Sequence, residues 1–598
     1  KQGASLRGDV RMLPKKFIRR GLACAGLSLL FVGSAAAAAD PIGSTNVTVA
    51  DPAVPRPPGT PCVVPLFSGV TFTDFNARPY AYAPPANCGT HWAKVVLEAD
   101  FSVTAGRQFD RTASLWLGGV NLYFGTTQEP SATVAPSWHV ERDLTDYSAL
   151  LRQPGNGQAV IGNVVNDTYT GVIGGSARLL FYPASLSAPA AKTPDAVYPL
   201  GSDAVGNTVA LGDSSSQLAK VLSLPRNVER AYLDVFVQSQ GSDEFWYTCV
   251  PDQYAAEVQE CGGGNFREAE VSIDGQPAGV APVYPWIYTG GIDPYLWRPT
   301  PGVQTLNFMP YRVDLTPFAG VLSDGAPHQV AVSVAGAHNY FSATASLLVY
   351  QDAHAQQISG QIERNTLVDQ PPTPTISDTL STDADGNITG NIGTNLSRHF
   401  VIQGYANTSH GRVHHKVEQT VSFADTQGFT INATTYRQVS DQLTSVNSVS
   451  QSSVGGVVIG EYREQANYPL HLDYTQQVAD DGSFTLATVV RQDYVKHGEH
   501  RLFGITLYSD KVNNTVSSAD TLDLNASGSV TGHTGQQSTQ AFAFRDSLGG
   551  CYRSSVGTQS GVVTSYSSGN GCRNQQNRLF WFSHPDGSPD TGNTMLGW

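Results

Sequence analysis

Short runs rich in Val, Leu, Phe, Tyr and Trp recur along the chain, separated about every 8 to 12 residues by Gly, Pro, Asn or Asp. This spacing is typical of antiparallel sandwiches, because each run has the length of a strand and each break has turn chemistry. Apolar residues at helical spacing are scarce, and the 598 residues include only 3 Met. The pattern therefore predicts an all-β fold with little helix.

The chain is too long for one domain, since a domain has roughly 150 residues. A Pro/Ala/Ser-rich passage at 183–194 and a shift to Thr, Ser, Gln and Asn after residue 359 indicate two boundaries. We predict one sandwich over 40–190, a second over 191–358 and a β-rich C-terminal region over 359–598. The clearest predicted strands are 93–98, 112–117, 177–182, 230–237, 268–273, 414–423, 429–437 and 484–495, with a hairpin turn at Asp274 and Gly275.

The N-terminus has the pattern of an export signal. Four basic residues between Lys15 and Arg20 precede an apolar run at 21–32, and a string of Ala ends at Asp40. This run is shorter than the roughly 20 residues that span a bilayer. We expect an upstream extension and signal peptide over 1–39, cleavage near Ala39 and Asp40, and a secreted or periplasmic protein.

The charge pattern excludes two classes of partner. The formal net charge is −14, only 14% of the residues are charged, and Lys and Arg do not cluster beyond the N-terminus. Nucleic acid and anionic lipid are recognised through basic patches, so we expect neither nucleic acid nor a membrane as partner.

Six of the seven Cys fall in three neighbouring couples, Cys62 with Cys88, Cys249 with Cys261 and Cys551 with Cys572. In an oxidising compartment this spacing favours three local disulfides, although six Cys allow 15 pairings. Local pairing leaves no thiolate there for Cys-His catalysis. The sequence contains no CxxC pair and no HExxH motif, so we expect neither a metal nor another cofactor.

Two acidic residues in the first predicted sandwich are candidates for chemistry. Asp110 stands between Arg107 and Arg111, just before an apolar strand. A partly buried carboxylate must be paired or hydrogen-bonded, so an ion pair with either Arg is the alternative to a catalytic role. Asp167 precedes Tyr169 in a turn-like segment, where capping of the turn explains an Asp equally well.

The second predicted sandwich carries a run of two acids followed by three aromatics, in which Asp243 and Glu244 come shortly before Trp246. Aromatic rings stack on sugar faces and carboxyls bond hydroxyls or transfer protons, so this run suggests a carbohydrate ligand. The alternative is an ordinary edge strand with a polar turn. The segment 288–299 adds Asp293, Trp297 and Arg298, and its alternative interpretation is a packed loop.

These segments also carry a resemblance to the peptide-N-glycosidase A type of peptide-N4-(N-acetyl-β-glucosaminyl)asparagine amidases, over about residues 61–352. The similar motifs are 106–111, 116–119, Glu129 with Pro130, 167–171, 224–231, 243–247 and 287–299. The same region distantly resembles flavobacterial peptide-N-glycosidase F. That resemblance implies two adjacent antiparallel jelly-roll sandwiches with acidic residues in the cleft between them.

The resemblance also implies roles for individual residues. Asp110, in a Phe-Asp-Arg motif, is implied to be the principal catalytic acid, and the further implied catalytic acids are Asp167, Glu244 and its neighbour Asp243. The residues expected to bind substrate are Arg107, Arg111, Glu129, Tyr169, Trp246, Asp293, Trp297 and Arg298.

The activity that the resemblance implies is hydrolysis of the amide between Asn and the first GlcNAc of N-glycans on peptides and proteins. Asn becomes Asp, and the released glycosylamine later loses ammonia. We expect carboxylate-assisted attack by water, an optimum below neutral pH and tolerance of core α1,3-fucose. Two other classes stay open, an endo-β-N-acetylglucosaminidase and a non-catalytic carbohydrate-binding protein.

Overall fold

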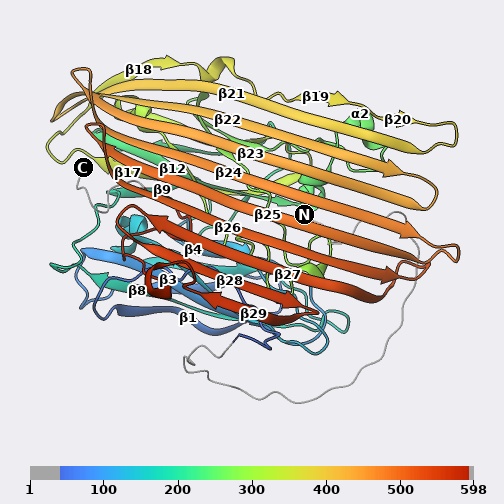
Figure 1. Cartoon of the computed structure of the whole chain (residues 1–598). Coiled ribbons are helices and arrows are strands. Elements are labelled where there is room, and N and C mark those ends of the chain that lie inside the picture. Colours follow the sequence, from blue (N-terminus) through green and yellow to red (C-terminus); the bar gives the residue numbers. More distant parts are fainter. Residues whose placement is uncertain (1–40, 591–598) are drawn as a thin grey trace.

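The computed structural model describes residues 41–590, so the expected signal peptide lies outside the described range. Antiparallel strands in five sheets make up this part of the chain (Figure 1), which confirms the all-β class. The α-helices in this range have four residues each, α1 (Ser148–Leu151), α2 (Asp252–Ala255) and α3 (Ala319–Leu322). None of them is long and apolar enough to cross a membrane.

The first unit consists of two four-stranded sheets. One sheet has the order β1 (Cys62–Phe72), β8 (Ile173–Pro183), β3 (Trp92–Val103) and β6 (Ser137–Asp143). The other has the order β2 (Arg78–Tyr82), β7 (Gly155–Ile161), β4 (Thr112–Leu117) and β5 (Val120–Thr126). Buried apolar residues from both sheets form one cluster, so the sheets pack face to face.

The second unit repeats this strand order. One sheet has the order β10 (Val209–Leu211), β17 (Tyr340–Gln351), β12 (Val228–Gln240) and β15 (Tyr311–Asp314), and β9 (Ala196–Pro199) also pairs with β17. The other has the order β11 (Leu218–Ser223), β16 (Pro327–Ala335), β13 (Glu268–Ile273) and β14 (Gln276–Pro282). In both units an early strand pairs with a late one, which is the nested order of a jelly roll.

Local sequence explains several of these strands. The predicted strands 112–117 and 268–273 coincide with β4 and β13. Asp274 and Gly275 have φ angles of 50° and 76°, as expected for the hairpin turn between β13 and β14.

A twelve-stranded sheet, here called the C-terminal sheet, forms a layer across the molecule (Figure 1). Its main strands are β18 (Ser359–Asn365), β21 (Ile388–Thr408), β22 (Gly411–Ile431), β23 (Thr435–Val454), β24 (Val457–Val478), β25 (Phe484–Leu502), β26 (Ile505–Leu524), β27 (Val530–Asp546), β28 (Cys551–Gln559) and β29 (Val562–Ser568). The short strands β19 (Thr375–Asp378) and β20 (Ser381–Thr382) pair with β21. The predicted strand 429–437 is wrong, because it spans the turn between β22 and β23.

The second unit and the C-terminal sheet share one hydrophobic core. Tyr284 packs its ring 5.0 Å from that of Tyr468, and Phe266 lies 5.4 Å from Phe423, measured between ring centroids. These contacts remove aromatic surface of both parts from water, so each part depends on the other for its stability.

Three disulfides join Cys62 to Cys88, Cys249 to Cys261 and Cys551 to Cys572. The predicted local pairing is therefore confirmed.

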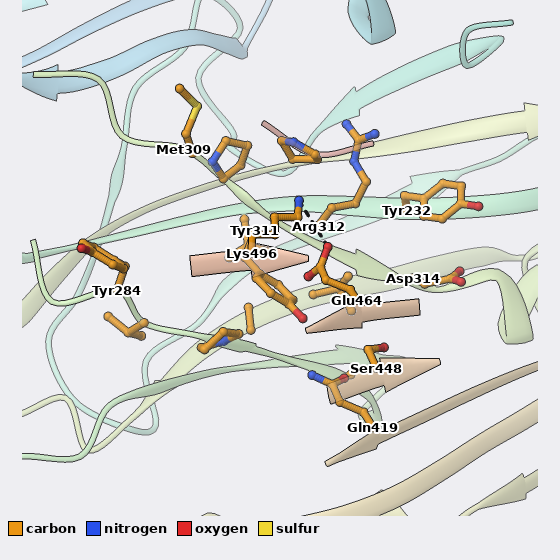
Figure 2. Close-up of a pocket in the computed structure, with 18 of the residues that line it drawn as sticks. Tyr232, Tyr284, Met309, Tyr311, Arg312, Asp314, Gln419, Ser448, Glu464 and Lys496 are labelled. Carbon is orange, nitrogen blue, oxygen red and sulfur yellow. Dashed lines mark ion pairs between the residues drawn. The ribbon is translucent and has the colours of Figure 1, made fainter. Parts of the chain in front are cut away.

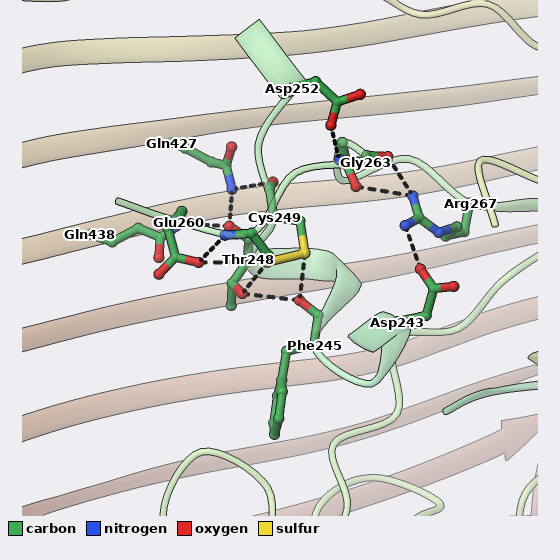
Figure 3. Close-up of a disulfide and its surroundings, with 12 residues drawn as sticks. Asp243, Phe245, Thr248, Cys249, Asp252, Glu260, Gly263, Arg267, Gln427 and Gln438 are labelled. Atoms are coloured by element: carbon green, nitrogen blue, oxygen red, sulfur yellow. Dashed lines mark hydrogen bonds and ion pairs between the residues drawn. A yellow bond between two sulfur atoms is a disulfide. The ribbon is translucent and has the colours of Figure 1, made fainter. Parts of the chain in front are cut away.

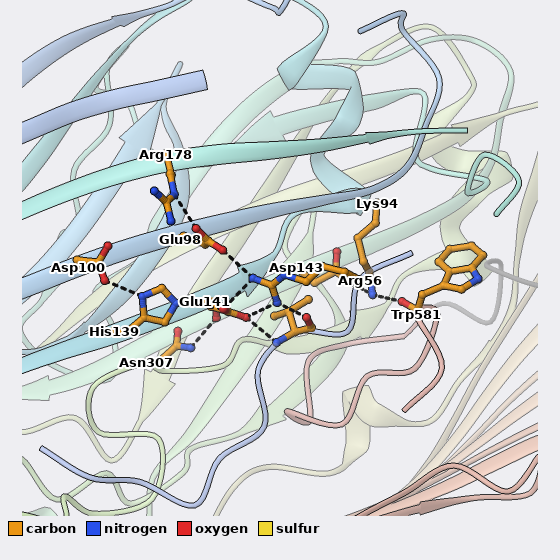
Figure 4. A network of polar contacts seen from close by, with 11 residues as sticks. Arg56, Lys94, Glu98, Asp100, His139, Glu141, Asp143, Arg178, Asn307 and Trp581 are labelled. Atoms are coloured by element: carbon orange, nitrogen blue, oxygen red, sulfur yellow. Dashed lines mark hydrogen bonds and ion pairs between the residues drawn. The ribbon is translucent and has the colours of Figure 1, made fainter. Parts of the chain in front are cut away.

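A network of ion pairs fixes the segment before β1 to the first unit (Figure 4). Arg56 contacts Glu98 at 2.8 Å and Glu141 at 2.7 Å, and His139 contacts Asp100 at 2.7 Å. Burial alone would raise the pKa of Glu141, but the hydrogen bonds and charges of His139 and Arg56 outweigh this effect and lower the pKa to about 2. The atoms of Glu98, His139 and Glu141 lie close enough to hold a cation, yet the Arg56 guanidinium already supplies the positive charge there.

Candidate active site

Asp110 and Glu129 lie side by side because they flank the same hairpin. β4 and β5 pair with Thr112 opposite Thr126, so the residues before β4 lie beside those that follow β5. The backbone N–H of Asp110 donates to Oε1 of Glu129 over 3.3 Å. Glu129 is 6% exposed, whereas Asp110 is half-buried and so closer to solvent.

Gly290 of the second unit contacts both carboxylates. Its backbone N–H donates a hydrogen bond to Asp110. A Cβ atom at this position would lie 2.4 Å from Oε1 of Glu129 and 2.8 Å from Oδ1 of Asp110, so a side chain would displace them. Sequence reasoning did not select Gly290, and its only signal is the Gly-Gly pair within an aromatic loop.

Glu244 completes what we call the three-carboxyl group, Asp110, Glu129 and Glu244. It follows η2 (Gly241–Asp243), the turn after β12. Burial and then the negative charges of Asp110 and Glu129 raise the pKa of Glu244 to about 8. The second unit thus contributes an acid to a site whose other two acids come from the first.

The other two members also have raised pKa values. Burial raises the pKa of Asp110 to about 6, against the lowering effects of the Gly290 N–H and the Arg111 charge. Burial and the charge of Asp110 raise the pKa of Glu129 to about 8, with Arg298 opposing the rise. Near neutral pH the three-carboxyl group therefore carries about one negative charge.

Arginine side chains surround this group without pairing with Asp110. Arg298 bonds Glu129, with 3.0 Å between Nη2 and Oε2, and Nη2 of Arg111 donates to Gln108 over 2.8 Å. Within residues 41–590, no ion pair shorter than 4 Å joins Asp110 to Arg107 or Arg111. The ion-pair interpretation of Asp110 is therefore wrong.

A patch of one cation and two rings adjoins Asp110. The guanidinium of exposed Arg107 lies 5.8 Å from the ring centre of Phe109 and 5.5 Å from that of Tyr169. Asp167 is exposed in the turn before Tyr169, and across the described residues no hydrogen bond or ion pair joins it to the three-carboxyl group. Such a patch suits contact with a sugar ring at the rim of the site.

Asp243 points away from the site, unlike its neighbour Glu244. Its carboxylate bonds Arg267 at 2.7 Å, and both side chains are 1% exposed (Figure 3). Its other oxygen accepts the backbone N–H groups of His338 and Asn339. These partners occupy both oxygens, so the geometry speaks against a catalytic role for Asp243.

Three residues expected to bind substrate are buried. Trp246, Trp297 and Asp293 are at most 1% exposed, so they do not line an open surface. The indole of Trp297 donates to the carbonyl of Gly291 over 2.9 Å, and Asp293 accepts the N–H of Tyr295 over 2.8 Å. In this structure Trp297 and Asp293 hold the loop that follows Gly290. The prediction that these three residues contact the substrate is therefore corrected: they lie beneath the surface and support the residues around them.

A cavity of about 100 Å³ lies between the second unit and the C-terminal sheet (Figure 2). Arg312 and Tyr311 line it from one side, and Glu464 and Lys496 form an ion pair of 3.2 Å on the other. None of the three-carboxyl group lines this cavity, so it is separate from the candidate active site.

Comparison with known proteins adds a family to this geometry. The model of the family described as peptide N-acetyl-beta-D-glucosaminyl asparaginase amidase A matches residues 62–367. Peptide-N4-(N-acetyl-beta-glucosaminyl)asparagine amidase A of Prunus dulcis is 27% identical over 435 residues, which cover 69% of this chain and 74% of the relative.

Two solved structures show weaker likeness. PNGase F, a glycosylasparaginase from Flavobacterium meningosepticum, has a TM-score of 0.36 and 13% identity, covering 49% of this chain and 96% of that one. A structure of PNGF-II has a TM-score of 0.33 and 12% identity, covering 50% and 66%.

Three neighbouring carboxyl groups with raised pKa values, contributed by two all-β sandwiches, are features that enzyme sites share. Since the family model covers half of the chain, including all three acids, the chain belongs to the peptide N-acetyl-beta-D-glucosaminyl asparaginase amidase A family.

Proposed function

We propose that the chain hydrolyses the amide bond between Asn and the first GlcNAc of N-glycans on peptides and proteins. The observation that carries this proposal is the three-carboxyl group, which lies within the region that the family model matches. The product peptide contains Asp, and the released glycosylamine then loses ammonia to water.

Asp110 is the proposed base. With a pKa of about 6 it is ionised at neutral pH and takes a proton from the attacking water, whose oxygen bonds to the amide carbon. The Gly290 N–H and the Asp110 backbone contact with Glu129 fix the orientation of this carboxylate.

Glu244 is the proposed acid. Its pKa of about 8 keeps it protonated at neutral pH, so it donates a hydrogen bond to the substrate amide as negative charge develops there. When the tetrahedral intermediate collapses, the C–N bond breaks and the departing nitrogen takes a proton from Glu244 or Asp110. Arg107 and Tyr169, and Asp167 beside them, are the proposed sugar-binding residues at the rim.

The pH dependence follows from these two roles. The rate rises as Asp110 ionises near pH 6 and falls as Glu244 loses its proton near pH 8. The proposed optimum thus lies close to neutral, slightly above the acidic optimum expected from the sequence.

Export and fucose tolerance belong to the same proposal. The three disulfides support a secreted or periplasmic location, because such bonds persist in oxidising compartments. Tolerance of core α1,3-fucose rests on family kinship alone.

Mass spectrometry of a defined N-glycopeptide after incubation tests the proposal. Amidase action yields the peptide with Asp in place of Asn. A peptide that retains one GlcNAc would identify an endo-β-N-acetylglucosaminidase, and an intact glycopeptide would identify a binding protein; either result would overturn the proposal.

A further inference from the structure

The loop formed by residues 293–298 rests on two strands of the C-terminal sheet. Ser518 of β26 donates from Oγ to the carbonyl oxygen of Leu296 over 2.6 Å. Gln536 of β27 donates from Nε2 to the carbonyl oxygen of Arg298 over 3.1 Å. Both side chains are buried, so these bonds are shielded from competition by water.

A pair of acids strengthens the same contact. Asp293 of the loop and Asp520 of β26 are both buried, and burial together with the nearby Asp520 carboxyl raises the pKa of Asp293 to about 8, so Asp293 is protonated at neutral pH. Asp520 also contacts Nδ1 of His533 at 3.1 Å, and the His533 ring stacks on Tyr295 with 3.8 Å between ring centroids. Side chains of β26 and β27 therefore bind both ends of the 293–298 loop.

The loop leads directly to the three-carboxyl group. Arg298, its last residue, bonds Glu129 at 3.0 Å and lowers the pKa of that acid. Glu129 in turn accepts the N–H of Asp110. Glu129 thus binds the guanidinium of Arg298, while the C-terminal sheet binds the backbone carbonyl of the same residue.

We infer that β26 and β27 are a positioning element of the active site, in which Ser518, Asp520 and Gln536 place Arg298 against Glu129. None of these residues touches the three-carboxyl group, so they are positioning residues rather than catalytic ones. The inference rests on the proposed function, and it assigns residues 505–546 a part in catalysis beyond the shared core.

A matched pair of variants separates positioning from general support. Gln536→Ala removes the hydrogen bond to Arg298. Gln540→Ala removes another buried Gln, which lies four residues further along the same strand and on the same face. The Oε1 atom of Gln540 accepts the N–H of Ala50 over 2.6 Å. Both variants leave a similar void, but only Gln536 contacts the 293–298 loop. kcat, KM and the pH profile are measured for both with one defined N-glycopeptide.

Gln536→Ala is expected to lower kcat at least about ten-fold, since small displacements of aligned groups are costly. Its alkaline limb should move to lower pH, because a less well-placed Arg298 leaves Glu129 neutral to higher pH and so removes part of the negative charge that raises the pKa of Glu244. Gln540→Ala should keep the wild-type kcat and pH profile. Equal effects of the two variants, or an unmoved alkaline limb for Gln536→Ala, would overturn the inference.

Two further observations keep the test decisive. If Gln536→Ala does not fold, Ser518→Ala is compared with Ser518→Thr, which retains the hydroxyl; the inference requires loss of kcat in the first and recovery in the second. A wild-type protein that leaves every N-glycopeptide intact refutes the proposed function, whereas an active wild type with indifferent variants refutes the positioning role alone.

Discussion

The first sandwich and the C-terminal sheet bury different kinds of side chain. The core of the sandwich is apolar, with residues such as Leu97, Leu115 and Phe181 fully buried. The C-terminal sheet also buries many polar side chains, including Gln427, Gln438, Gln492, Ser518, Asp520, Gln536 and Gln540. Apolar packing stabilises a core without direction, whereas buried hydrogen bonds fix particular groups in place.

The buried polar side chains of the C-terminal sheet form hydrogen bonds with the loops that carry active-site residues. Gln427 and Gln438 donate to the carbonyl of Thr248, just after Glu244, as Figure 3 shows. Gln492 bonds the backbone of Pro285 and Val303, on either side of Gly290. The sandwiches thus supply the acids, and the C-terminal sheet holds the loops on which Glu244 and Gly290 lie.

Removing the C-terminal sheet should have the largest effect. A chain ending at residue 358 would expose Tyr284 and Phe266, whose rings now pack on Tyr468 and Phe423. We expect little soluble protein and no near-ultraviolet circular dichroism typical of packed aromatics. A soluble, active fragment would show that the sandwiches position their loops without the sheet.

The neighbouring acids Asp243 and Glu244 should behave oppositely. Glu244→Gln removes the proposed acid and should lower kcat about 10²- to 10⁴-fold. Its stability at pH 7 should change little, because Glu244, with a pKa of about 8, is already neutral there.

Asp243→Asn breaks a buried ion pair with Arg267 and should lower the free energy of unfolding by roughly 3–5 kcal/mol. The folded fraction should retain its kcat. Thermal melts and initial rates distinguish the two acids, and a fully stable but inactive Asp243→Asn variant would restore its catalytic assignment.

Gly290→Ala tests the close approach of the second unit to the acids. The added methyl would meet Glu129 and Asp110, so we expect a loss of activity of about ten- to a hundred-fold from displaced carboxylates. Gly460→Ala on β24 is the control, since no atom lies within 4 Å of its added Cβ. Equal rates for the two variants would argue against the tight packing described here.

Thiol alkylation should have the smallest effect. The six Cys between residues 41 and 590 are all in disulfides, so iodoacetamide should leave the rate of glycopeptide hydrolysis unchanged. Strong inhibition would instead indicate a catalytic thiolate.

Apolar runs bounded by turn-forming residues were sufficient to predict β4 and β13 from the sequence, because most of the buried side chains of these strands are ordinary core residues. The same reasoning misplaced 429–437, where Phe429 and Tyr436 belong to different strands separated by a turn at Asn432. The lengths of the strands in the C-terminal sheet could not be predicted either. The buried face of this sheet carries many polar side chains, and Gln and Ser do not indicate burial in a sequence.

The site was predictable to a similar extent. Asp110 and Glu244 could be identified from the residues around them. Within the turn, however, a shift of one position separates an acid that faces the site from one that pairs with Arg267, and the sequence does not show which is which. The pairing of Glu129 with Asp110 depends on the register of β4 and β5, and the approach of Gly290 on the packing of two units. Neither can be deduced from local spacing.

The pH dependence of kcat/KM for wild type and Asp110→Asn tests the central claim most directly. The account predicts a bell with limbs near pH 6 and pH 8 for wild type, and no measurable hydrolysis by Asp110→Asn. A wild-type rate that peaks above about pH 8, or an Asp110→Asn variant that retains the wild-type profile, would contradict catalysis by the three-carboxyl group.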